Sequence, residues 1–210
     1  MAYRTESLET YLADASAGQP TPGGGSASAL AGAVGVSMAC MAANFTVGNE
    51  RFQEAWPRVS ELLRKCDEAR DSLLRFVDDD VAAYSQVSAA YSMPRSTPEE
   101  KAARTAAIQE ALKSAMKTPL NIFVTCADVL GALDELADLA NPNLISDVGV
   151  AAALVLGALE GAELNVEINL ASLKDSVVVK STRALLAESD GRARKTAGKI
   201  LDKVHGRIRE

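Results

Sequence analysis

Hydrophobic positions recur with the period of an α-helix along almost the whole chain. After Pro57, apolar side chains follow one another three or four residues apart, which predicts a long amphipathic helix. The pattern can be followed through Tyr84 to Tyr91, and Met93–Pro94 ends it. Val177–Val179 is a short run that could form a strand, but it has no partner strand in the sequence.

Capping residues and prolines mark the expected helix boundaries. Thr5 can cap a first helix that runs to about Ala17, with Leu8, Tyr11 and Leu12 on one face.

The later boundaries follow from the same signals. Thr97-Pro98-Glu99-Glu100 has the pattern of a capping box and predicts a new helix. Pro119 is expected to break or kink the helix that follows. Asp190–Gly191 is expected to separate the last two helices, and the final one is basic.

Two stretches have the character of central helices. One is expected from Ser26 to about Thr46, within a segment that carries no charge between Ala17 and Asn49. The second runs from Val148 to Leu159, after a turn at 141–143. We therefore predict an all-α protein, a single multihelical domain over residues 1–210, with two buried central helices wrapped by amphipathic ones.

Composition narrows the classes of function. The formal charge of −6 argues against a nucleic-acid partner. The chain has one His and three scattered Cys residues (Cys40, Cys66 and Cys126), which predicts no metal site and no disulfide framework. Charged residues near the N-terminus do not fit a signal peptide, so a cytoplasmic location is expected. The uncharged segment is rich in Gly, Ala and Ser, which favours a buried helix over a membrane span.

The segment Pro20–Ser26 reads Pro-Thr-Pro-Gly-Gly-Gly-Ser and leads directly into the first central helix. Glycines leave backbone N–H groups open to a ligand, which predicts a binding site at this helix N-terminus. The segment matches neither the Gly-Lys-Ser/Thr phosphate loop nor the dinucleotide fingerprint. Two interpretations of Gly24 stay open: its backbone lies against the substrate, or it supplies a positive φ for a bend.

Acid–base chemistry falls mainly to carboxylates in a chain with a single His. Asp147 stands between a polar turn and an apolar helix, where it could be a catalytic base or could simply complement the helix dipole. The second candidate is Asp80, which shares a helix face with Tyr84. The simpler interpretation of Asp78–Asp80 is a solvated acidic face, and adjacent acids on a helix point too far apart to bind a metal ion together.

Taken in order, these motifs resemble the cyclodeaminase/cyclohydrolase family over essentially the full length. The motifs are Pro20–Ser26, Thr46-Val47-Gly48, Asp78–Tyr84, Met93-Pro94, Thr118-Pro119-Leu120 and Asn143–Gly149. The resemblance implies a multihelical homodimer whose site residues lie in the same motifs. The implied catalytic residues are Asp147 and Asp80, and the implied substrate-binding residues are Pro22, Gly23, Gly24, Gly25, Ser26, Thr46, Arg51, Asp78, Tyr84, Asn143 and Ser146.

One segment departs from the family pattern. Members often carry Lys residues and a Tyr after the Thr-x-Gly element, whereas this chain has Asn49-Glu50-Arg51-Phe52. Arg51 is then the only cation there to meet the anionic tail of folate.

The resemblance implies a folate enzyme that needs no metal, nucleotide or redox cofactor. The expected reaction is hydrolysis of 5,10-methenyltetrahydrofolate to 10-formyltetrahydrofolate, in which a carboxylate takes the proton of the attacking water. The alternative is formimidoyltetrahydrofolate cyclodeaminase, which would release ammonia. A third, more distant alternative is a non-catalytic helical module that dimerises through its Ala/Gly helices.

Overall fold

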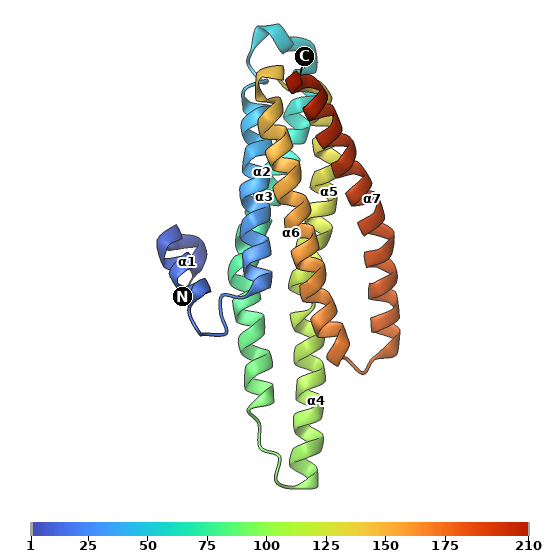
Figure 1. The fold of residues 1–210 in the computed structure, drawn as a ribbon. Helices are drawn as coiled ribbons and strands as arrows, with labels where there is room; N and C mark the ends of the chain where they lie inside the picture. The colour runs from blue at the N-terminus through green and yellow to red at the C-terminus, as the bar shows by residue number, and fades with distance from the viewer. Residues whose placement is uncertain (1, 210) are drawn as a thin grey trace.

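The computed structural model describes residues 2–209 as a bundle of long helices, with no strand in that range. This confirms the predicted all-α class. Figure 1 shows the long helices side by side, with α4 extending the bundle at one end and α1 apart from it at the side. The α-helices are α1 (Leu8–Ser16), α2 (Gly24–Asn44), α3 (Trp56–Tyr91), α4 (Pro98–Ala115), α5 (Lys117–Leu139), α6 (Ile145–Ser172) and α7 (Ser176–Arg209), and the 3-10 turns are η1 (Tyr3–Thr5), η2 (Glu50–Ala55) and η3 (Pro142–Leu144).

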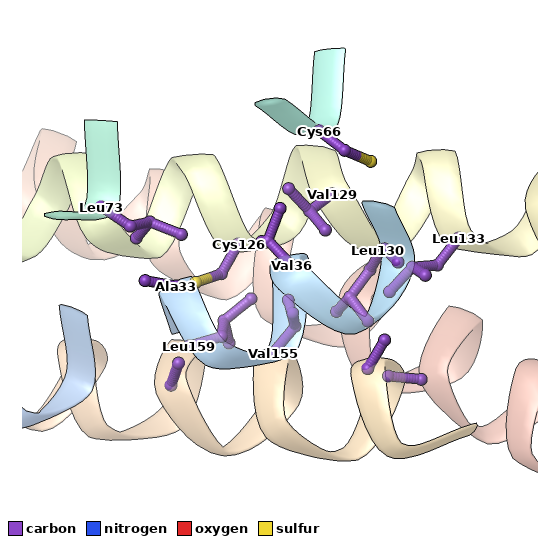
Figure 2. Packing of buried hydrophobic residues seen from close by; sticks show 14 of the residues in the cluster. Ala33, Val36, Cys66, Leu73, Cys126, Val129, Leu130, Leu133, Val155 and Leu159 are labelled. Atoms are coloured by element: carbon purple, nitrogen blue, oxygen red, sulfur yellow. The ribbon is translucent and has the colours of Figure 1, made fainter. Parts of the chain in front are cut away.

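Close packing of α2 on α6 forms the centre of the core. A Cβ at Gly35 would lie 2.9 Å from Cγ2 of Val155, so glycine lets the two helices approach closely. Figure 2 shows Ala33 and Val36 of α2 pointing between side chains of α5 and α6. Small side chains on α2 therefore set a short spacing that bulkier residues would prevent.

The same two helices are open to solvent on their other side. Nothing crosses in front of α2 and α6 in the view of Figure 1. By length and hydropathy alone, Gly24–Asn44 and Pro142–Ser172 could each cross a membrane, yet 61% and 44% of their apolar windows are buried in the bundle. Because each exposes one face, the prediction of two buried central helices stays a prediction for the assembled protein.

Several predicted boundaries are confirmed. The amphipathic helix continues to Tyr91 as a single helix, α3. Thr97 and Glu100 form the expected capping box of α4. The helical run breaks at Met116, three residues before Pro119, because proline lacks the N–H that would bond to the preceding turn. The first central helix begins at Gly24, two residues earlier than expected.

The predicted first helix is wrong at its start. α1 begins at Leu8, and the Ser7 side chain caps it by accepting a hydrogen bond from the Thr10 N–H. Thr5 lies in η1 instead. Tyr11 is buried, whereas Leu8 and Leu12 are exposed, so these three side chains do not form one buried face.

The predicted break at Asp190–Gly191 is also wrong. α7 is continuous there, and Asp190 pairs with Arg194 one turn later, which supports the helix. The boundary lies before α7, where the Asp175 carboxylate accepts hydrogen bonds from the first backbone N–H groups of the helix. Val177–Val179 lies in the first turns of α7 and forms no strand.

Candidate active site

A cavity of about 380 Å³ opens where α2 begins, between α2, α3, α4 and α6. We call it the α2 pocket. It brings the Gly-rich segment together with the acidic segment of α3, although the two are far apart in sequence. Its lining residues are Pro20, Thr21, Gly23, Gly24, Asp80, Ala83, Tyr84, Val87, Leu112, Ala115, Asn165, Ile168, Asn169 and Ser172.

A larger hollow of about 620 Å³ lies between α3 and α5. Its charged lining residues are of both signs, Lys65, Glu68, Asp128 and Glu135, and it contains none of the sequence-predicted site residues. Volume alone would therefore not select the α2 pocket, but the chemistry of its lining does.

Asp80 reaches the α2 pocket from α3 and holds the first turn of α2. The Ser26 N–H donates a hydrogen bond to Oδ2 of Asp80 over 2.9 Å. A Cβ at Gly25 would collide with Oδ1 of Asp80, so only glycine leaves room for the carboxylate. Burial raises the pKa of Asp80, and the Ser26 hydrogen bond offsets the rise only in part. A carboxylate with a raised pKa beside a cavity is suited to take up and return a proton.

Gly24 is the first residue of α2, with Gly23 as its N-cap. Of residues 2–209, only Gly48 has a positive φ, so the interpretation that Gly24 supplies a positive φ is wrong. Instead, the missing side chain lets Asn165 of α6 lie close to the Gly24 backbone. A Cβ at Gly24 would lie 3.0 Å from Nδ2 and 3.3 Å from Oδ1 of Asn165. The backbone N–H groups of this first turn have no acceptor within the helix.

Two asparagines of α6, Asn165 and Asn169, supply further polar groups to the lining of the α2 pocket. The sequence analysis missed both. Nδ2 of Asn165 donates to the Gly161 carbonyl and Nδ2 of Asn169 donates to the Asn165 carbonyl, each over 2.8 Å. These bonds fix the amides so that each Oδ1 remains an acceptor. The available signal was a pair of polar residues four positions apart in an otherwise apolar helix.

The other predicted residues near this end differ in their relation to the pocket. Tyr84 lines it beside Asp80, as their shared helix face predicted. Ser26 is buried, and its Oγ accepts a hydrogen bond from the Tyr11 hydroxyl. Asp78 does not line the pocket, and its carboxylate pairs with Arg4 at 3.4 Å. Pro22 is buried in the loop behind the pocket.

The remaining predicted residues lie at the opposite end of α2. Thr46 is fully buried there, and its Oγ1 accepts a hydrogen bond from the Asn141 N–H over 2.9 Å, which joins the end of α2 to the turn before α6. Arg51 lines a separate hollow of about 630 Å³. α2 has 21 residues and is therefore about 30 Å long. Within one chain, this end cannot contact the α2 pocket.

Asn143, Ser146 and Asp147 belong to this second group. Asn143 lies in η3, and its N–H donates to Oδ1 of Asn141 over 3.1 Å. Ser146 and Asp147 are in the first turn of α6, and Ser146 is exposed. The structure thus divides the predicted site into two groups, one around Asp80 and one around Asp147.

The charge of the α2 pocket is one-sided. Its lining has no Lys, Arg or His, whereas it has one carboxylate and two amide oxygens. Within residues 2–209, no three His, Cys, Asp or Glu side chains come together in a way that could hold a metal ion. The pocket can therefore receive a cationic or hydrogen-bond-donating group, flanked by the apolar side chains of Ala83, Val87 and Ile168.

Known proteins match this chain in sequence and in structure over most of its length. A methenyltetrahydrofolate cyclohydrolase of Methylorubrum extorquens is 39% identical over 188 residues, which covers 88% of this chain and 90% of the relative. A formimidoyltransferase-cyclodeaminase of Rattus norvegicus is 32% identical over 201 residues, but this chain spans only 37% of that longer protein. The solved structure of a formiminotetrahydrofolate cyclodeaminase from Thermotoga maritima superposes with a TM-score of 0.88 at 27% identity and covers 98% of this chain and 99% of that one.

The family profile described as formiminotransferase-cyclodeaminase matches residues 7–188. That range includes the Gly-rich segment, Asp80, both asparagines and Asp147. The match confirms the resemblance inferred from the ordered motifs. This chain belongs to the formiminotransferase-cyclodeaminase family.

Proposed function

We propose that this protein is a methenyltetrahydrofolate cyclohydrolase that binds its substrate in the α2 pocket. It converts 5,10-methenyltetrahydrofolate and water to 10-formyltetrahydrofolate. The proposal draws its reaction from the Methylorubrum extorquens relative, which matches this chain over nearly its full length. The substrate is a small-molecule folate, and no further cofactor takes part.

The observation that carries the proposal is the one-sided charge of the α2 pocket. The substrate carries a delocalised positive charge across N5, the bridging carbon and N10. A pocket with Asp80, two amide oxygens and no cationic side chain favours such a group electrostatically. Its volume of about 380 Å³ is in the range that holds a flat ring system.

Asp80 acts as the proton acceptor in this reaction. A water oxygen bonds to the bridging carbon, and the proton that it loses passes to the Asp80 carboxylate. The bond from the carbon to N5 then breaks, N5 gains a proton, and the hydroxyl proton leaves as the formyl group forms on N10. One proton is released overall, which balances the positive charge that the substrate loses.

Formimidoyltetrahydrofolate cyclodeaminase is the second candidate, because the Rattus norvegicus and Thermotoga maritima relatives carry that name. In that reaction N10 attacks the formimino carbon and ammonia leaves, so the same acceptor-rich pocket would serve. Two assays on one preparation separate the candidates. Loss of methenyl absorbance with appearance of 10-formyltetrahydrofolate supports the cyclohydrolase, whereas ammonia release from the formimino substrate supports the cyclodeaminase. Absence of both activities favours the non-catalytic helical module.

We also propose that the protein is a cytoplasmic homodimer without a membrane or nucleic-acid partner. Support for a dimer comes from the solvent-exposed side of α2 and α6, which we call the α2–α6 face. Its largest exposed side chains are Val34, Phe45, Val150, Leu164 and Ile168. Pairing of two copies would bury this face and make α2 and α6 the central helices of the assembly.

The raised pKa of Asp80 predicts the pH dependence of the reaction. As the pH falls through this pKa, the carboxylate is protonated and can no longer accept a proton, so kcat/KM should fall at a pH above the ordinary pKa of aspartate. A pH–rate profile measures this. A kcat/KM that stays level down to about pH 4 would contradict it.

The raised pKa of Asp80 also makes the free energy of unfolding depend on pH. Between the ordinary and the raised pKa, the folded state binds more protons than the unfolded state, so the free energy of unfolding should decrease as pH rises through that window. Denaturant titrations across the window should show this slope in the wild type and a weaker slope in Asp80→Asn.

Chelators should leave the activity unchanged. The scattered Cys residues and the single His offer no set of transition-metal ligands, so the reaction is expected to run without a metal ion. The assay is turnover before and after dialysis against EDTA. Activity that EDTA removes and Mg²⁺ or Zn²⁺ restores would overturn the metal-free mechanism.

A further inference from the structure

The N-terminal segment, η1 and α1, contacts the first turn of α2 through one buried tyrosine. In Figure 1, α1 lies at the side of the bundle near the start of α2. Tyr11 of α1 is only 4% exposed, whereas Leu8 and Leu12 of the same helix are exposed. The Tyr11 hydroxyl donates a hydrogen bond to Oγ of Ser26 over 3.2 Å. Tyr11 does not line the α2 pocket, so any effect on the site must pass through Ser26.

Ser26 stands at a helix position that an N-cap side chain usually satisfies. It is the third residue of α2, and the N-cap Gly23 has no side chain that could accept its N–H. The Asp80 carboxylate accepts this N–H instead, over 2.9 Å, while the Tyr11 hydroxyl binds the Ser26 side chain. Side chains from α3 and α1 therefore replace the missing cap, and both act on one residue.

The first turn of α2 depends on these contacts for its position. Gly24 and Gly25 precede Ser26, and glycine allows backbone conformations that other residues do not. Ser26 is fully buried, so its Oγ cannot turn to bulk water when the Tyr11 hydroxyl is missing. Loss of this hydroxyl would leave a buried acceptor unpaired and favour movement of the turn, which carries the N–H that Asp80 binds.

Tyr11 is itself fixed by other residues of the N-terminal segment. The ring of Tyr3 packs edge-on against the ring of Tyr11, with centroids 5.4 Å apart and an interplanar angle of 86°. The Tyr3 hydroxyl donates to Oδ2 of Asp14 over 2.9 Å, and Arg4 pairs with Asp78 of α3. The segment is thus tied both to the first turn of α2 and to the acidic segment of α3.

Few titratable groups lie near the Asp80 carboxylate. Tyr84 of α3 is the other titratable residue in the lining of the α2 pocket, to which α2, α4 and α6 contribute none. The neighbouring charges of Asp78 and Arg4 pair with each other. Burial raises the pKa of the Tyr11 phenol, and the nearby charge of Asp80 adds to the rise. Tyr11 therefore stays protonated and remains a hydrogen-bond donor at neutral pH.

We propose that Tyr11 is a positioning residue of the α2 pocket, which acts through Ser26 to hold the N–H that binds Asp80. The N-terminal segment then supports catalysis without touching the substrate. Burial raises the pKa of Asp80, and the Ser26 hydrogen bond opposes that rise. When Tyr11 no longer holds Ser26, this bond weakens and the carboxylate takes up its proton at a higher pH. The inference rests on the proposed function for the role of Asp80 as proton acceptor.

Tyr11→Phe tests the proposal, because it removes the hydroxyl and keeps the ring. Its kcat should fall about 3–10-fold at neutral pH, the effect of one weakened hydrogen bond. KM should change little, because Tyr11 lies outside the pocket lining, and the acid limb of kcat/KM should move to higher pH. Tyr3→Phe is the matched control: it removes a hydroxyl that bonds to Asp14, so its acid limb should stay at the wild-type position.

Ser26→Ala tests the route from Tyr11 to Asp80. This variant keeps the backbone N–H but removes the Oγ that Tyr11 holds, so it should move the acid limb in the same direction. The effects of Tyr11→Phe and Ser26→Ala should not add in the double variant, because each change breaks the same contact. Additive losses, or a wild-type acid limb in Tyr11→Phe, would overturn the proposal.

Hydrogen exchange of the Ser26 amide, followed by NMR, measures the same contact without activity. The amide of Leu130, a buried residue of α5, serves as the reference for global unfolding. Relative to this reference, the Ser26 amide should exchange about 3–10-fold faster in Tyr11→Phe than in the wild type, and at the wild-type rate in Tyr3→Phe. Equal acceleration of both amides would mean that the hydroxyl serves stability alone, and would overturn the proposal.

The exchange measurement also separates this inference from the proposed function. A catalytically inactive wild type whose Ser26 amide responds to Tyr11→Phe would contradict the proposed function and leave the positioning role supported. An active wild type whose Ser26 amide and acid limb do not respond would overturn the positioning role alone.

Discussion

Asp80→Asn is expected to lower turnover by about 10²–10⁴-fold, the loss typical of a missing general base. Asparagine cannot accept the proton of the attacking water, and it removes the negative charge that faces the cationic ring. Its amide oxygen can still accept the Ser26 N–H, so the first turn of α2 should stay in place. Steady-state kinetics on a preparation of known folded fraction measures the effect.

The neighbouring Asp79 supplies the matched control. It is exposed on α3 and lies outside the α2 pocket, so Asp79→Asn removes a charge of the same kind without touching the site. Near-normal turnover is expected for this variant. If both variants lost activity equally, the acidic segment would act through its overall charge and Asp80 would have no specific role.

Gly25→Ala should abolish turnover almost as completely, although it adds only one methyl group. That methyl group would collide with Oδ1 of Asp80, so the carboxylate must move and its bond to the Ser26 N–H weakens. Overpacking of this kind costs about 1–3 kcal/mol of stability. The expected result is a large loss of kcat with a modest loss of thermal stability, measured on the same preparation.

Gly198→Ala is the control for a glycine in a helix. No atom lies within 4 Å of a Cβ at this position of α7. The change should stabilise the protein by about 0.5–1 kcal/mol and leave kcat unchanged, because alanine favours the helix. If Gly25→Ala lost activity only in proportion to its unfolded fraction, the close approach of Asp80 would not matter for catalysis.

Local signals predicted the helices, because capping and periodicity act within a few residues. The capping box at Thr97 and the amphipathic pattern up to Tyr91 are examples. The break expected at Asp190–Gly191 failed because ion pairs to Arg194 and the packing of α7 on α6 outweigh the small cost of one glycine. Such tertiary contacts are not encoded in the local pattern.

Several residues of the candidate site could be predicted from the sequence. Their separation into two groups, around Asp80 and around Asp147, could not. The Gly-rich segment and Asp80 were identified from residue type, and the structure brings them into one cavity. Asn165 was missed because a polar residue in an apolar helix can be assigned to a site only when its neighbour on another helix, here Gly24, is known. The separation of Asp147 from Asp80 follows from the length of α2, which the sequence indicates, and from the antiparallel packing of α6, which it does not.

The most direct measurement of the central claim is the rate at which methenyl absorbance disappears in the presence of purified protein. Wild type and Asp80→Asn are compared at equal concentrations of folded protein, and buffer without protein gives the uncatalysed rate. The account predicts a wild-type rate far above buffer and an Asp80→Asn rate reduced by about 10²–10⁴-fold. A wild-type rate equal to that of buffer, or an Asp80→Asn rate equal to that of the wild type, would contradict it.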